Sequence, residues 1–177
     1  MSDKAKASLK NILKLKPEIL RQAEAHTLDP CLVGAIISRE TLGLNMWGQP
    51  PNKGGVLGDG GFGHGPMQVD KRSFPEWCAE WRAGKHTLED GISKGCSVLN
   101  EKLAEVVTMS RPGGPYEKLS EPDKLRAAIS AYNTGARNVK AAVRKGLDVD
   151  IYTTGKDYSR DVLEQAEFFR EHGLAVD

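Results

Sequence analysis

Hydrophobic residues recur every three to four positions through most of the chain, as in amphipathic helices. The clearest case is the stretch "DPCLVGAIISRE". Its apolar face consists of Leu32, Val33, Ile36 and Ile37. Asp29 is suited to cap this helix, and Pro30 is suited to its first position. The pattern predicts a helix that begins at Pro30 and ends near residues 41–43.

Two further helix starts are indicated by a hydroxyl side chain followed three residues later by an acid. Thr87 with Asp90, and Ser120 with Asp123, have this spacing, which is typical of a capping box. Long apolar faces follow both pairs, so each is predicted to open a helix. The remaining helices are expected to begin near Asp3 and Pro17 and to cover about residues 136–146 and 158–173.

One stretch departs from the helical pattern. Seven glycines lie between Gly54 and Gly65, and the run "MQVD" that follows alternates apolar and polar side chains. This alternation predicts a short strand with Met67 and Val69 on one face and Gln68 and Asp70 on the other. We therefore expect a mostly helical α+β fold that forms a single domain over residues 1–177. Residues 1–16 are expected to form a peripheral N-terminal helix.

Composition excludes several classes of protein. The 177 residues carry 25 Lys and Arg against 24 Asp and Glu, and this net charge of +1 gives no electrostatic case for nucleic acid. No stretch approaches the roughly 20 apolar residues that cross a bilayer, so no membrane association is expected. Residues 1–16 contain lysines but no continuous apolar segment, so no signal peptide is expected. The three cysteines, Cys31, Cys78 and Cys96, are expected to be buried free thiols.

Glu40 is the first candidate for chemistry. It lies four residues after Ile36 and three after Ile37, so it continues an apolar helix face on which carboxylates are rare. Burial and the negative end of the helix dipole would both favour its protonated form. Such an acid can donate a proton to a leaving oxygen. Alternatively, Glu40 is the first exposed residue at a helix end, or the partner of a nearby arginine.

Asp59 and Asp70 are the second and third candidates, because the glycine-rich loop and the strand would present them. Glycoside hydrolysis requires an acid on one side of the bond and a carboxylate on the other. Alternatively, Asp59 forms a turn, and Asp70 caps the backbone or pairs with Lys71 or Arg72. The loop lacks the features of a nucleotide or calcium site, and the four histidines show no ligand spacing, so neither a metal nor a cofactor is expected.

Three motifs in this order resemble goose-type lysozymes: "AIISRE", "GFGHGPMQVDKRS" and "ISAYNTGARNV". The final "DYSRDVLEQAEFFREHG" matches as well, so the resemblance covers about residues 17–173. It implies a lysozyme-like α+β fold, shared with soluble lytic transglycosylases, with a small β element at the active-site cleft. Enzymes of this family cleave the β-1,4 bond between N-acetylmuramic acid and N-acetylglucosamine in peptidoglycan. Thr41 and Leu42 depart from the family, which has a small residue and a histidine after the glutamate.

The resemblance also implies roles for particular residues. Glu40 corresponds to the general acid, and Asp59 and Asp70 to carboxylates that position or activate water for an inverting hydrolysis. The expected sugar contacts are Gln68, Tyr132, Asn133 and Tyr158. Tyr132 could instead belong to the core, and Asn133 could merely terminate a helix.

The same resemblance implies an antibacterial, extracellular, monomeric enzyme that needs no cofactor and acts on peptidoglycan or N-acetylglucosamine oligosaccharides. Two other functions stay open at this point. A lytic transglycosylase would form a 1,6-anhydro product without water, and a binding module would hold peptidoglycan without cleaving it.

Overall fold

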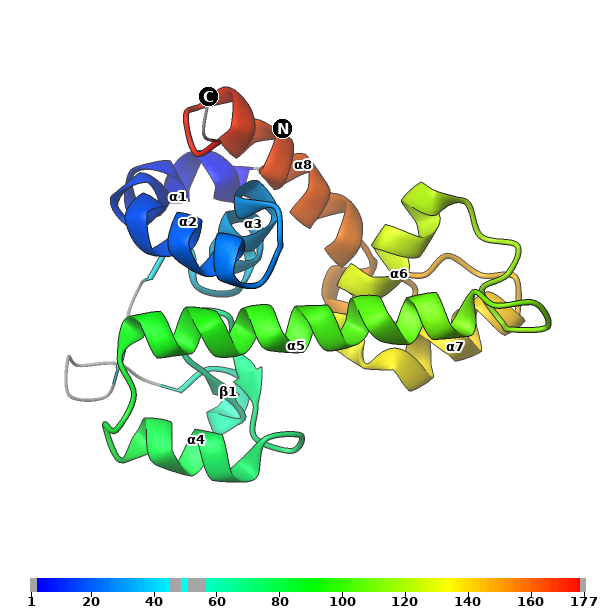
Figure 1. Cartoon of the computed structure of the whole chain (residues 1–177), viewed down its shortest axis with the longest axis horizontal. Coiled ribbons are helices and arrows are strands. Elements are labelled where there is room, and N and C mark those ends of the chain that lie inside the picture. Colours follow the sequence, from blue (N-terminus) through cyan, green and yellow to red (C-terminus); the bar gives the residue numbers. More distant parts are fainter. Residues whose placement is uncertain (1–2, 45–48, 51–56, 176–177) are drawn as a thin grey trace. The chain divides into compact units, whose positions relative to one another are not determined.

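The computed structural model describes residues 3–44, 49–50 and 57–175. Its contacts divide the chain into two compact units, residues 1–97 with 163–177, and residues 98–162. Helices dominate both units, and one two-stranded sheet lies in the first (Figure 1). This agrees with the mostly helical α+β fold expected from the sequence.

Helix α3, Pro30–Thr41, is the central element of the first unit. It contacts α1, Asp3–Lys14, and α2, Lys16–Ala25, and Figure 1 shows the three helices packed together. The predicted start of α3 is confirmed, because the Asp29 side chain accepts a 2.9 Å hydrogen bond from the Cys31 amide. On the α1 side the buried Ser8 and Ser38 hydroxyls lie 2.7 Å apart, so α1 is tied to α3 by a polar contact as well as by apolar packing.

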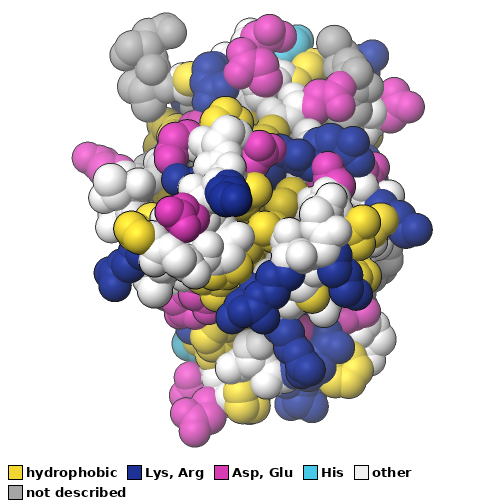
Figure 2. Space-filling model, turned by 90° about the vertical axis from the view of Figure 1, so that its right-hand side faces the viewer, with side chains coloured by type: hydrophobic (Ala, Val, Ile, Leu, Met, Phe, Trp, Pro, Cys, Tyr) yellow, Lys and Arg dark blue, Asp and Glu magenta, His cyan; other side chains and the backbone are white. Residues whose placement is uncertain are grey.

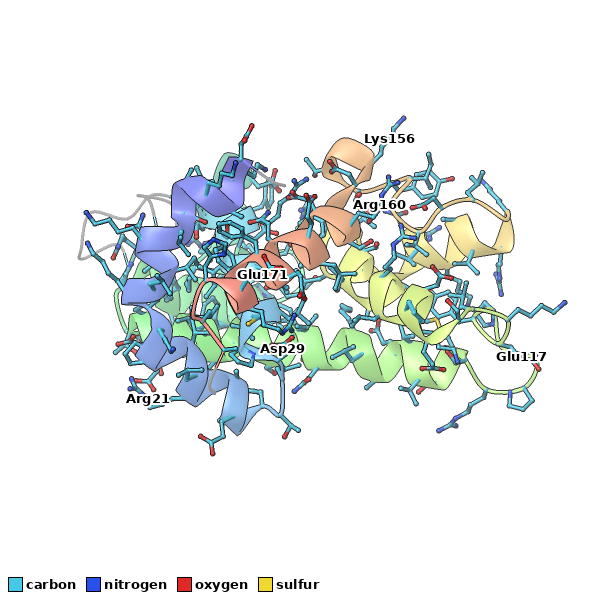
Figure 3. The ribbon with its side chains drawn as sticks, turned by 90° about the horizontal axis from the view of Figure 1, so that it is seen from above. Arg21, Asp29, Glu117, Lys156, Arg160 and Glu171 are labelled. Carbon is cyan, nitrogen blue, oxygen red and sulfur yellow. The ribbon has the colours of Figure 1, made fainter. Side chains whose placement is uncertain are left out.

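The carboxylate of Asp29 also connects the beginning of α3 to the C-terminal helix α8, Tyr158–Glu171. Arg170 pairs with the Asp29 carboxylate, and Figure 3 shows Asp29 beside the end of α8 that carries Glu171. Asp29 therefore serves as a helix cap and as an ion-pair partner at the same time.

The sheet is a hairpin of β1, Gly63–His64, and antiparallel β2, Val69–Asp70, with Gly63 opposite Asp70. The predicted strand over residues 67–70 is thus too long by two residues. Gln68 has a left-handed backbone (φ 51°), and its amide donates to the Gly65 carbonyl at 3.1 Å, so the chain turns there. Met67 and Val69 are nevertheless buried, as the alternation predicted.

The hairpin packs against α4, Pro75–Arg82, and the first turns of α5, Leu88–Met109. The Thr87 and Asp90 side chains bond each other's backbone amides at 3.1 and 2.7 Å, which confirms the predicted capping box. Gly91 and Gly95 of α5 face the hairpin, and a Cβ at Gly95 would come within 2.3 Å of the Met67 sulfur. These two glycines allow the hairpin to lie directly on α5.

The second unit consists of the rest of α5, α6 (Glu121–Thr134), α7 (Ala136–Arg144) and the start of α8. Helix α6 begins as predicted, with the Ser120 hydroxyl accepting from the Asp123 amide at 3.3 Å. The core of this unit contains Val106, Tyr116, Ala127, Ala128, Ala131, Val139 and Val149.

The charges are unevenly distributed despite the net charge of +1. On the face that Figure 2 displays, Lys and Arg side chains gather in the lower half, whereas the upper half mixes both signs. In the second unit, α7 alone contributes Arg137, Lys140 and Arg144 and no acidic residue. In the part of the chain that the structure describes, no helix is long and apolar enough to cross a membrane.

All three cysteines are buried free thiols, as the sequence predicted. Burial raises the pKa of Cys31 and Cys78 to about 11 and that of Cys96 to about 12. They are therefore protonated at neutral pH and act as small apolar core residues.

Candidate active site

Glu40 lies in the last turn of α3 and is half-buried. The helix ends at Thr41, where Leu42 adopts a left-handed conformation (φ 50°) and its amide donates to the Ser38 carbonyl at 2.9 Å. Ile36, one turn earlier on the same face, is fully buried. The helix end predicted near residues 41–43 is confirmed, so the negative end of the helix dipole lies beside Glu40.

Thr41 connects this helix end to the hairpin. Its buried hydroxyl lies 2.9 Å from the Ile37 carbonyl and 3.0 Å from the Pro66 carbonyl, so its one proton is shared between them. Pro66 is in the turn between β1 and β2. The residue after Glu40 therefore fixes the end of α3 against the turn that precedes Asp70.

The glycine-rich loop is shaped by the side chain of Gln68. Gly58 and Gly63 bond each other through both amides, at 3.1 and 3.0 Å. A Cβ would lie 1.9 Å from the Gln68 Oε1 if placed at Gly58 and 2.2 Å if placed at Gly63. The side-chain nitrogen Nε2 of Gln68 also donates to the Gly65 carbonyl at 2.9 Å. A side chain at Gly58 or Gly63 would therefore displace the end of the Gln68 side chain from this position.

Asp59 and Asp70 are brought together by Arg72. The Arg72 Nε lies 2.9 Å from both oxygens of Asp70, and its Nη2 lies 3.3 Å from Oδ2 of Asp59. The Arg72 backbone amide donates to Asp70 Oδ1 at 2.7 Å. Below the guanidinium lies the Phe62 ring, 4.8 Å from Cζ to the ring centre. The sequence indicated Arg72 only as an alternative partner of Asp70, not as a link between the two aspartates.

The surroundings of Asp70 favour its charged form. Burial raises the pKa of Asp70, but the side-chain and backbone hydrogen bonds of Arg72, together with its charge, outweigh burial and hold the pKa below its usual range. Asp70 is therefore ionised in neutral and mildly acidic solution.

The remaining candidates lie in the second unit. Asn133 accepts a 3.0 Å hydrogen bond from the Thr154 amide through its Oδ1, so its side chain holds the segment before α8. Tyr132 is half-buried on α6. Tyr158 opens α8 and is only 1% exposed, so its ring is enclosed by protein. Their expected contacts with sugar stay predictions.

A second acidic cluster was not indicated by the sequence. The buried Asp150 accepts hydrogen bonds from the Ser130 hydroxyl at 2.7 Å, the Ser159 hydroxyl at 2.7 Å and the Ser159 amide at 2.9 Å. Arg126 Nη2 bonds Asp148 at 2.9 Å and lies 3.5 Å from Asp150. Burial raises the pKa of Asp150, but these hydrogen bonds lower it by more, so the pKa is below its usual range.

This second cluster joins three segments of the unit. Ser130 is on α6, Asp148 and Asp150 follow α7, and Ser159 is in the first turn of α8. Arg160, labelled in Figure 3 near that end of α8, lies 3.9 Å from the Asp150 carboxylate. Because every partner is internal, we interpret the cluster as a structural tie rather than a site for a ligand.

No group of three or more His, Cys, Asp or Glu side chains in residues 3–44, 49–50 and 57–175 could hold a metal ion. His64 on β1 is buried, and burial lowers its pKa, so it is neutral near pH 7. Its Nδ1 lies 3.0 Å from the Phe62 carbonyl, within the hairpin.

Comparison with known proteins is decisive for the family. A family model described as lysozyme g matches residues 2–173. The chain belongs to the lysozyme g family. It is 30% identical to the lysozyme g of Dromaius novaehollandiae over 173 residues, which are 96% of this chain and 72% of that protein. The Gallus gallus lysozyme g is 31% identical, with 96% and 70% covered.

Membership makes the chain a glycoside hydrolase of the lysozyme type, with peptidoglycan as its substrate class. The resemblance inferred from the three motifs is thereby confirmed. The roles of individual residues in this chain stay predictions.

Proposed function

We propose that this protein hydrolyses the β-1,4 bond between N-acetylmuramic acid and N-acetylglucosamine with inversion. Glu40 acts as the general acid, and Asp59 and Asp70 position the attacking water. The proposal is supported mainly by the convergence of Asp59 and Asp70 on the Arg72 guanidinium. Asp70 lies in a hairpin whose turn is hydrogen-bonded to Thr41, the residue after Glu40.

The proposed reaction requires different protonation states of the carboxyl groups. Glu40, half-buried in the last turn of α3, is assigned the protonated form. Asp70 lies beside Arg72, which favours its charge. A protonated acid and an ionised carboxylate are the two forms that glycoside hydrolysis requires at one pH.

The reaction then proceeds in one displacement. The Glu40 proton is transferred to the bridging oxygen as its bond to the anomeric carbon breaks. A water held by Asp59 and Asp70 attacks that carbon from the opposite face, and its proton is transferred to a carboxylate. Gln68, Tyr132 and Asn133 are proposed to contact the sugars, whereas the Tyr158 ring is enclosed by protein and is not offered as a contact. No cofactor takes part in these steps.

Replacing the acid tests this assignment. Glu40→Gln keeps the shape of the side chain and removes the transferable proton, so we expect the rate on peptidoglycan to fall by about 100-fold or more. Glu24→Gln, an exposed change on α2, is the matched control. A Glu40→Gln protein as active as that control would contradict the assignment, and 1,6-anhydro ends in the wild-type digest would indicate a lytic transglycosylase instead.

The biological role is part of the same proposal. We propose that the protein lyses bacteria outside cells, as a monomer. Clearing of a bacterial suspension by the purified chain, but not by Glu40→Gln, is the expected result, with a sedimentation measurement to give the mass of the active species.

A further inference from the structure

We propose that Arg72 is a positioning residue of this active site, and that its guanidinium holds Asp59 and Asp70 together at the place where the water binds. The inference rests on the proposed function and deepens it, because it assigns a role in the reaction to the guanidinium on which the two aspartates converge.

The contacts of Arg72 fix it from three directions. Its Nε and backbone amide bond Asp70 at 2.9 and 2.7 Å, and its Nη2 reaches Asp59 at 3.3 Å. The flat face of the guanidinium lies over the Phe62 ring. A planar group with two acceptors on its edges and an aromatic ring on its face has little freedom to rotate. The two carboxylates are therefore held in a defined relative orientation.

Stability does not explain this arrangement. The side chains of Arg72, Asp59 and Asp70 are 61%, 71% and 37% exposed, and ion pairs in such surroundings contribute little to folding. Asp59 also adopts a left-handed backbone (φ 48°), which is unfavourable for a residue with a side chain. A pair of acids that is ordered but still exposed is able to contact both a bound ligand and a water molecule.

The charge of Arg72 has a chemical consequence as well. Two carboxylates near one another repel, and each raises the other's pKa. A guanidinium between them offsets this repulsion, and its hydrogen bonds and charge hold the pKa of Asp70 below its usual range. Arg72 thus favours the ionised form of Asp70, the form that the proposed reaction requires.

The other groups that face Asp70 contribute less than Arg72. A protonated His64 on β1 would also lower the pKa of Asp70 by its charge, but burial lowers the pKa of His64, so it is neutral near pH 7. The Cys78 thiol on α4 is neutral because burial raises its pKa to about 11. Among the groups that shift the pKa of Asp70, Arg72 is the one whose hydrogen bonds lower it.

The test compares Arg72→Gln, Arg72→Lys and Arg111→Gln in the full chain. Arg111 is an exposed arginine in the second unit, so its replacement controls for the loss of one positive charge. Soluble peptidoglycan fragments serve as substrate, and kcat and KM are measured from pH 3 to 8. Thermal unfolding of each variant is followed in parallel.

For Arg72→Gln we expect kcat to fall by about 10- to 100-fold, because the water is no longer held in line. We expect KM to change far less, and the acid limb of the profile to move to higher pH as Asp70 loses its cation. Arg72→Lys retains a charge but not the planar fork, so its acid limb should stay closer to that of wild type while kcat stays low.

If both Arg72 variants have the same kcat, KM and pH profile as Arg111→Gln, the inference is overturned. If Glu40→Gln is inactive and the Arg72 variants are normal, only the positioning role fails. If the wild-type chain cleaves no glycosidic bond, the proposed function itself fails. Should Arg72→Gln not fold, the kcat of folded Arg72→Lys decides, because a purely structural arginine would leave that kcat at the wild-type value.

Discussion

Two clusters of this molecule join an arginine to a pair of aspartates, but in opposite surroundings. In the first unit Arg72 binds Asp70 and a second aspartate, and 61% of the arginine side chain is exposed. In the second unit Arg126 binds Asp150 and a second aspartate, with the arginine 19% exposed and Asp150 fully buried. The comparison teaches that burial decides what such a cluster does. When it is buried, the cluster joins segments of the chain; when it is exposed, its carboxylates remain accessible to solvent.

The largest expected effect on stability is in the buried cluster. Asp150→Asn removes a charge that is bonded to two serines and lies near Arg126, so we expect a loss of about 3 kcal/mol in the free energy of unfolding. Asp70→Asn should lose about 1 kcal/mol or less, because its partner is exposed. Urea denaturation of both variants measures the difference. Equal losses would contradict the distinction between the clusters.

Activity should show the reverse order. Asp70→Asn removes a carboxylate that we propose holds the attacking water, and we expect kcat on peptidoglycan to fall by about 100-fold. The same assay on folded Asp150→Asn, at a temperature well below its unfolding midpoint, should give a much smaller loss. A lower kcat for Asp150→Asn than for Asp70→Asn would contradict the distinction between the two clusters.

The pH dependence of stability should come largely from the buried cluster. The pKa of Asp150 and that of Asp148 are lowered in the folded protein. Their stabilisation is therefore complete above the unfolded pKa of about 3.9 and is lost as pH falls through the folded values. The unfolding temperatures of wild type and Asp150→Asn should converge below about pH 4. A constant difference from pH 7 to pH 2 would contradict this.

The smallest expected effect concerns a single hydroxyl of the buried cluster. Ser130→Ala removes one of the hydrogen bonds that Asp150 accepts and leaves the Ser159 bonds in place. We expect a loss of about 1 to 2 kcal/mol in the free energy of unfolding, with kcat unchanged. A fall in kcat at unchanged stability would instead connect this cluster to the reaction.

The parts of the fold that depend on local sequence could be predicted. The caps at Asp29 and at Thr87 with Asp90 form between residues two or three positions apart, so spacing alone indicates them. The end of α3 next to Glu40 follows from the same kind of pattern. Local interactions of this type can be predicted from the sequence because they do not depend on the rest of the fold.

The parts that depend on loop conformation could not be predicted. Alternation suggested that Gln68 faces outward from a strand, but its backbone is left-handed and its side chain lies on Gly58 and Gly63. Arg72 reaches Asp59 across 13 residues only because of this turn. The Asp150 cluster likewise gathers groups from three separate segments. Spacing along the chain carries no signal for such contacts.

The stereochemistry of the first product tests the central claim most directly. Proton NMR during the first turnovers reports the anomer of the new reducing end. A water held by Asp59 and Asp70 opposite Glu40 attacks the far face, so the account predicts the α-anomer first, with the β-anomer appearing later by mutarotation. A β-anomer at the outset, or a 1,6-anhydro sugar, would contradict it.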